Sequence, residues 1–205
     1  GCGDPAVMMD EELGGLVSRL VASDFDGPQR LAEARTRLGD NIACVLDGMA
    51  EAQPTVALLN AILDVVADAK RFEVDGMLGS GDVAVIVTSA GVAWGDVLPG
   101  VLASFDRCAG TNATYEADLR ILMGMVRAAT FPFPERKANS ESAISDRLFE
   151  NLRCSLKDQL RCAAGSTDAD ELDAITGMLT KIETLVSEAL LTQAHLAQAQ
   201  GELPV

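Results

Sequence analysis

Apolar residues recur three and four positions apart along most of this chain, which is the period of an amphipathic α-helix. The pattern is clearest near the carboxyl end, where one uninterrupted seam predicts a single helix that begins after Thr167 and continues to Leu196. The seam positions of this helix are Leu172, Ile175, Leu179, Ile182, Val186, Ala189, Gln193 and Leu196.

Similar patterns, bounded by Pro, Gly and Ser, predict further helices elsewhere in the chain. We expect them over about residues 10–23, 28–50, 112–130 and 140–164, with another that begins at Pro54. Together with the apolar segment after the Gly-rich stretch 76–81, they predict seven or eight helices.

The most apolar segment, residues 83–105, contains a single charged residue, Asp96. Residues 83–87 have a strand-like composition, but a lone strand would have no partner, so we predict a buried helix there. Gly91 breaks the run and Pro99 interrupts its second half, which predicts two short helices that form a buried central hairpin. The segment is also long enough to span a bilayer, so a pore-forming hairpin is the alternative.

These elements predict an all-α fold, with residues 1–205 forming a single compact multi-helix bundle. Nearly half of the residues are apolar but only 4% are aromatic, so the core consists of aliphatic side chains that suit close helix packing. No repeat or linker divides the chain. Residues 131–139, which include Phe131-Pro132-Phe133-Pro134, are the one candidate hinge.

The net charge of −15 changes the expected partners more than it changes the fold. An acidic surface repels phosphate backbones and anionic lipid surfaces, so it disfavours nucleic-acid binding and adsorption to membranes. The same charge favours solubility and basic protein partners.

Four cysteines allow two bridges between helices. Cys154 and Cys162 share a predicted helix and lie about 12 Å apart along its axis, which is too far for a disulfide between them. Each can instead pair with Cys44 or Cys108, which would imply an oxidising compartment. The alternative is that these residues are small buried side chains with free thiols.

Two features in other parts of the chain also concern the compartment. Cys2 is a candidate lipidation site of the kind found in bacterial lipoproteins, or else a stray thiol. Asn112-Ala113-Thr114 is a candidate glycosylation sequon. Together with the cysteines they favour a secreted or surface location slightly over the cytoplasm. A lipidated Cys2 or an exposed 83–105 hairpin are the expected routes to a membrane.

This sequence lacks the residues that most familiar catalytic sites require. The one histidine, His195, lies beside the last seam, so helical geometry turns it towards solvent and away from any catalytic triad. Asp64 and Asp68 share a helix face and could hold a metal, but a solvated strip explains them better. The stretch 79–82 could cradle a phosphate but lacks the P-loop lysine. We therefore expect neither a metal nor a cofactor.

Two segments resemble motifs of the Bcl-2 family. Residues 31–42, LAEARTRLGDNI, look like a BH3 segment, and residues 91–105, GVAWGDVLPGVLASF, look like BH1. The order matches the family, but Arg35 stands where BH3 has its central leucine, Asp96 stands where BH1 has an arginine, and a BH2 segment is absent. The resemblance implies a groove that binds an amphipathic helix through five partner-binding residues: Arg35, Leu38, Asp40, Trp94 and Asp96.

A patterned scaffold without convergent polar groups predicts a non-catalytic helical-bundle protein that binds another protein, as a surface or assembly subunit. The alternatives are a Bcl-2-like regulator that binds BH3-type helices and a pore-forming or cofactor-carrying helical protein.

Overall fold

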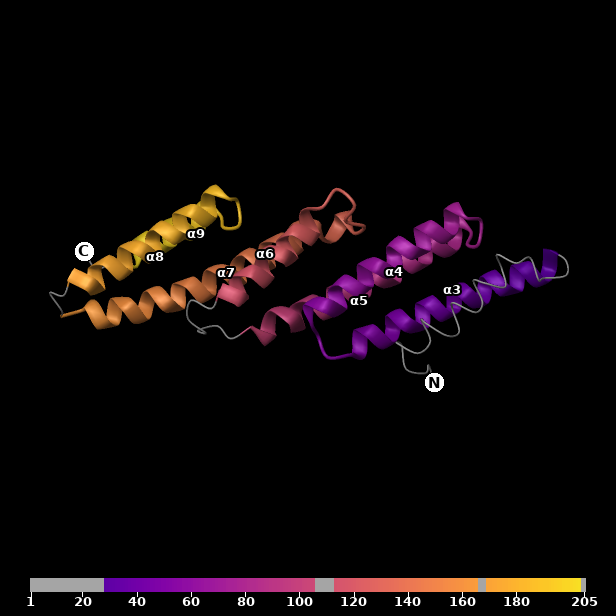
Figure 1. The fold of residues 1–205 in the computed structure, drawn as a ribbon, viewed down its shortest axis with the longest axis horizontal. Helices are drawn as coiled ribbons and strands as arrows, with labels where there is room; N and C mark the ends of the chain where they lie inside the picture. The colour runs from indigo at the N-terminus through magenta and orange to yellow at the C-terminus, as the bar shows by residue number, and fades with distance from the viewer. Residues whose placement is uncertain (1–27, 106–112, 166–168, 204–205) are drawn as a thin grey trace. The chain divides into compact units, whose positions relative to one another are not determined.

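The computed structural model describes residues 28–105, 113–165 and 169–203, and seven α-helices account for nearly all of them (Figure 1). The described residues contain no β-strand, which confirms the all-α prediction. The helices are α3 (Pro28–Glu51), α4 (Val56–Val74), α5 (Ser80–Ser104), α6 (Ala113–Arg127), α7 (Pro134–Ala163), α8 (Ala169–Ser187) and α9 (Gln193–Gly201).

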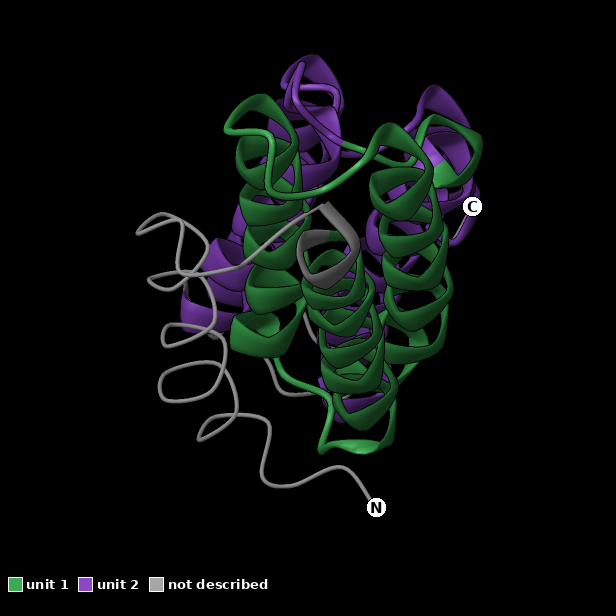
Figure 2. Ribbon diagram, turned by 90° about the vertical axis from the view of Figure 1, so that its right-hand side faces the viewer, with its two compact units in different colours: residues 1–101, 132–136 green, residues 102–131, 137–205 purple. Residues whose placement is uncertain are grey.

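The chain divides into two compact units, which Figure 2 shows in different colours. Unit 1 takes residues up to 101 together with 132–136, and unit 2 takes residues 102–131 together with 137–205. Each unit buries an apolar core of its own. The prediction of a single domain stays a prediction.

In unit 1, α3, α4 and α5 each bury one face of regularly spaced aliphatic residues. The face of α3 follows the predicted seam through Leu38, Ile42, Val45 and Met49. Helix α4 begins after Thr55, whose hydroxyl accepts a hydrogen bond from the Leu58 backbone N–H at 3.1 Å. The buried face of α4 comprises Leu59, Ile62, Val65, Val66 and Ala69.

The buried central hairpin is present, but its two arms are α4 and α5, joined by residues 75–79. The segment that we expected to break at Gly91 is one continuous helix, with Pro99 inside it. Tertiary packing outweighs glycine's low helix propensity here. A Cβ on Gly91 would lie 3.2 Å from the Phe133 ring, so this glycine allows the ring to approach the helix closely. A Cβ on Gly95 would meet the guanidinium group at the end of the Arg136 side chain.

Unit 2 is built from α6, α7, α8 and α9. Helix α7 begins at Pro134, about six residues earlier than the sequence predicts, because proline is well suited to the first position of a helix. Only residues 131–133 of the candidate hinge therefore lie outside a helix. The apolar faces of α6 and α7 follow the predicted periodicity, through Leu119, Leu122, Val126, Ile144, Leu148, Leu152 and Leu156. The seam predicted for α8 is only partly correct: Ile175 and Ile182 are buried as expected, but Met178 and Leu185 complete the buried face, and Leu172 is 56% exposed.

The helix with the most regular pattern is in fact two helices, so the prediction of one helix through Leu196 is wrong. After α8 the chain adopts a Schellman turn, in which the Leu190 N–H reaches the Leu185 carbonyl and the Ala189 N–H reaches the Val186 carbonyl. Ala189 has a φ of 58°. A glycine is usual at this position of a Schellman turn, and because the residue here is alanine, the sequence did not indicate that α8 ends there.

Candidate functional site

The exposed side of α5 carries two of the three exposed large apolar side chains of the described part of unit 1. Val85 is 60% exposed and Val92 is 50% exposed. They are seven residues apart and therefore lie on one side of the helix. The α5 outer face, as we call it, comprises the exposed residues Ala84, Val85, Thr88, Val92, Asp96 and Pro99.

The α5 outer face presents fewer free polar groups than its residue types suggest. The Thr88 hydroxyl donates a hydrogen bond to the Ala84 carbonyl of the same helix at 2.9 Å, so its donor is already used. Asp96 is the one charged residue of the face. The opposite side of α5 is anchored in the core by residues such as Ile86 and Trp94, which fixes the orientation of the helix.

The residues expected to bind a partner do not form a peptide groove. Leu38 and Trp94 are both 0% exposed and belong to the core of unit 1. Arg35 is directed to the turn after α4, where its Nη2 donates to the Gly76 carbonyl. Asp40 and Asp96 are exposed. The heptad spacing of the 28–50 seam already indicated a core position for Leu38, and this signal outweighs the motif resemblance.

The cysteines follow the sequence expectation only in part. Cys162 is a free thiol on an exposed side chain, so the bridge to Cys44 or Cys108 that we considered for it is wrong. Cys44 and Cys154 are each disulfide-bonded. Cys2, Cys108 and Asn112 lie outside the described residues, so the lipidation and glycosylation expectations stay predictions.

His195 is not a surface residue. Its side chain is 13% exposed, its Nε2 lies 3.0 Å from Asp146 Oδ1, and its ring stacks on Phe149 at 4.6 Å between centroids. The prediction of a solvent-facing ring is wrong because the chain breaks before Thr192, and α9 begins with a new helical register.

The surroundings of His195 resemble a catalytic triad in composition but not in connectivity. Nδ1 accepts a hydrogen bond from the Thr192 backbone N–H at 3.2 Å, as part of a capping box. Ser145 Oγ lies 3.5 Å from the same nitrogen, and Ser145 is buried. Because the Thr192 N–H occupies the Nδ1 lone pair, the ring is not positioned to take a proton from Ser145. The cluster instead connects α7 to α9.

The other polar candidates also have structural roles. Asp64 accepts a hydrogen bond from Asn60, and Asp68 pairs with Arg71 at 3.0 Å. The Gly79 N–H donates to Asp82 at 3.0 Å, so the glycine-rich turn caps α5 from within the chain. Among the described residues, no group of three or more His, Cys, Asp or Glu could hold a metal ion.

Comparison with known proteins adds no identification. No family model matches this sequence, and neither a curated protein nor a solved structure is similar to it.

Proposed function

We propose that this chain is a non-catalytic protein-binding subunit whose α5 outer face receives an amphipathic helix from another protein. The observation that carries the proposal is the pair Val85 and Val92, exposed one heptad apart on the most apolar of the described helices. A facing helix would cover both with residues spaced i and i+7, the usual arrangement when a helix docks on an apolar surface.

Charge favours a basic partner over a second copy of this chain. Two copies would each carry a net charge of −15 over the whole chain, and like charges disfavour close approach. Asp96, exposed on the α5 outer face, is available to a lysine or arginine at the edge of the partner helix. We therefore assign the surface to an amphipathic helix with basic flanking residues.

A fluorescent amphipathic Leu/Lys peptide, titrated at physiological salt and followed by anisotropy, tests this assignment. We expect the double variant Val85→Asn/Val92→Asn to bind about tenfold more weakly, because about 1.4 kcal/mol of apolar burial is lost. The matched control is Val74→Asn, which changes an 87% exposed valine on α4. Equal affinities for the two variants would contradict the proposal.

The size of the protein in solution tests separately whether the α5 outer face mediates self-association of this chain. Sedimentation velocity on the protein alone should give a monomer, because the second copy is disfavoured by charge. A stable homodimer that Val92→Asn dissociates would assign the α5 outer face to self-association instead.

Membrane insertion of α5 is the second candidate. Ser80–Ser104 is the one helix among the described residues that is long and apolar enough to cross a membrane, and 50% of its most apolar window is buried inside the protein. Dye release from neutral phosphatidylcholine vesicles would support insertion if Val92→Asn reduced it. If the vesicles stay intact under conditions in which the peptide binds, membrane insertion is contradicted and only the protein-binding proposal remains.

A further inference from the structure

His195 closes the first turn of α9 through one of its two ring nitrogens. Nδ1 accepts the Thr192 backbone N–H at 3.2 Å, and the Thr192 hydroxyl accepts the His195 backbone N–H at 3.3 Å, so the two residues cap the helix reciprocally. A ring nitrogen accepts an N–H only when it carries no proton itself. The ring therefore caps α9 in its neutral form, with its one proton on Nε2.

The other ring nitrogen holds the side chain on α7 whatever charge the ring has. Nε2 lies 3.0 Å from Asp146 Oδ1, and it carries a proton both in this neutral tautomer and in the charged ring. Phe149, also on α7, stacks on the ring with 4.6 Å between the centroids. Protonation of the ring therefore leaves its contacts with α7 in place and changes only what Nδ1 can do.

A proton on Nδ1 turns that atom from an acceptor into a donor. The Thr192 N–H is itself a donor, so it loses its partner when the ring is charged. Ser145 Oγ lies 3.5 Å from Nδ1 and can accept the new N–H. His195 is the third residue of α9, where the free N–H groups of the helix end also disfavour a cation. The charged ring thus stays on α7 but no longer caps α9.

Asp146 is the charged group that contacts the ring from α7, and the other charged side chains near it have partners of their own. Within α7, Arg147 pairs with Glu150. The remaining pairs that involve the elements around the ring are Arg153 of α7 with Glu202 after α9, and Arg120 with Glu188 in the turn before α9.

We propose that His195 is a proton-operated cap of α9. The neutral ring closes the first turn of the helix, whereas the protonated ring, still bound to Asp146, exchanges the Thr192 N–H for Ser145 Oγ and releases that turn. The switch acts between about pH 5 and pH 8, where an imidazole ordinarily changes its charge. It is independent of the α5 outer face, which belongs to unit 1.

Nuclear magnetic resonance of the intact protein tests the proposal, and the single histidine makes the ring signals unambiguous. Long-range proton–nitrogen spectra follow both ring nitrogens from about pH 8 down to about pH 5. Hydrogen exchange gives the protection factor of the Thr192 amide, which corrects for the intrinsic dependence of exchange on pH. We expect Nδ1 to be the unprotonated nitrogen at the alkaline end, and the Thr192 protection factor to fall about tenfold as Nδ1 gains its proton.

The variant His195→Gln separates the cap from its response to pH. A glutamine at this position of a capping box accepts the same backbone N–H through an oxygen that takes up no proton in this range. The Thr192 protection factor of the variant should therefore stay constant with pH. If the variant does not fold, the wild-type titration decides by itself.

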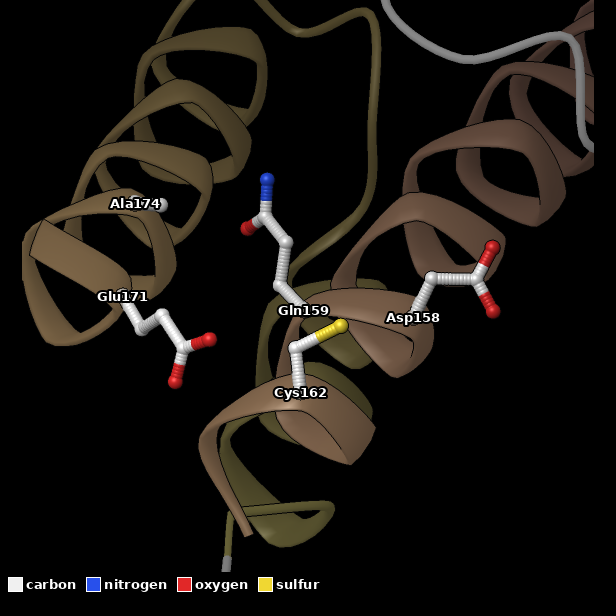
Figure 3. A pocket seen from close by; sticks show the side chains of 5 residues that line it. All are labelled: Asp158, Gln159, Cys162, Glu171 and Ala174. Atoms are coloured by element: carbon white, nitrogen blue, oxygen red, sulfur yellow. The ribbon is translucent and has the colours of Figure 1, made fainter. Parts of the chain in front are cut away.

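Two amides of the wild type serve as internal controls. The Leu58 N–H is capped by Thr55 at the start of α4 without a histidine. The Ala174 N–H belongs to α8, beside a hollow of about 200 Å³ between the last turns of α7 and the first turns of α8. Figure 3 shows the residues that line this hollow, none of which is a histidine: Asp158, Gln159, Cys162, Glu171 and Ala174. Both amides should keep their protection factors over the same range.

Four results would overturn the proposal. They are a Thr192 protection factor that stays constant while the ring titrates, a ring that gains no proton down to about pH 5, a variant His195→Gln that keeps the pH dependence, and an equal loss of protection at Leu58 and Ala174. The last result would indicate a general loosening of the protein, and the first would leave His195 as a purely structural link between α7 and α9.

Discussion

The two units keep their helices together by different kinds of contact. In unit 1 the described contacts between helices are mainly apolar, and they depend on close backbone approach: Gly100 lies so near the Pro54 ring that a Cβ would come within 2.6 Å of Cγ. In unit 2, ion pairs join α6 to α8 and to the turn after it: Lys181 pairs with Glu116 at 2.6 Å, and Arg120 pairs with Glu188 at 2.6 Å. Unit 1 should therefore respond to changes of volume, and unit 2 to pH and salt as well.

The largest expected effect in this comparison is at Trp94. Its side chain is fully buried, and its ring lies 6.0 Å from that of Phe133. Trp94→Ala should lower the free energy of unfolding by about 3–5 kcal/mol, because it removes a large apolar group and leaves a cavity. Urea denaturation followed by circular dichroism measures the change. Val85→Ala, on the exposed side of the same helix, should change it by less than about 0.5 kcal/mol.

A loss at Trp94 comparable to that of Val85→Ala would mean that the ring is not part of the core. It would also reopen the interpretation in which Trp94 faces a peptide groove, as the BH1-like sequence suggested.

Two glycine substitutions should act in opposite directions. Gly100→Ala places a methyl group against the rigid Pro54 ring, which outweighs the gain in helix propensity, and should cost about 1–2 kcal/mol. Gly177→Ala, in α8 of unit 2, meets nothing within 4 Å and should stabilise by about 0.5–1 kcal/mol. Thermal denaturation of both variants tests this, and stabilisation by Gly100→Ala would disprove the close contact.

How far the sequence could predict the structure differs along the chain for physical reasons. Helical faces such as that of Leu38 were predictable because burial imposes a period of 3.6 residues on the pattern. The continuity of α5 through Gly91 was not, because a glycine in an apolar run gives no local sign that it lies against Phe133, a residue distant in sequence. The partners of His195 were missed for a related reason, since one unpredicted turn changed the helical register of all the residues beyond it.

The turn that the sequence did not reveal provides the next prediction. Ala189 has a left-handed backbone conformation, which is unfavourable for any residue with a Cβ. Ala189→Gly should raise the free energy of unfolding by about 0.5–1 kcal/mol, because relief of this strain exceeds the added entropy of the unfolded chain. Chemical denaturation measures it. The control Ala194→Gly, on the exposed face of α9, should instead destabilise the protein.

The effect that separates the units by pH concerns Glu116. Burial raises the pKa of its carboxyl group, but hydrogen bonds from Lys181 and Arg120 outweigh burial, and the pKa lies below its ordinary value of 4.5. A carboxyl group whose pKa is lower in the folded state stabilises the protein above its unfolded pKa. This stabilisation is lost as the pH falls from about 4.5 through the lower folded value.

Glu116→Gln removes both ion pairs at nearly constant size, so it should cost about 0.5–1 kcal/mol at neutral pH and low salt. The difference from the wild type should shrink in about 1 M salt, and again as the pH falls from about 4.5 through the lower folded pKa of Glu116, where the wild-type side chain itself takes up a proton. Urea denaturation across a pH series measures both trends, with Glu183→Gln as the exposed control on α8. A cost that stayed constant with pH and salt would show that Glu116 contributes through packing, and that unit 2 does not differ from unit 1 in the way its contacts suggest.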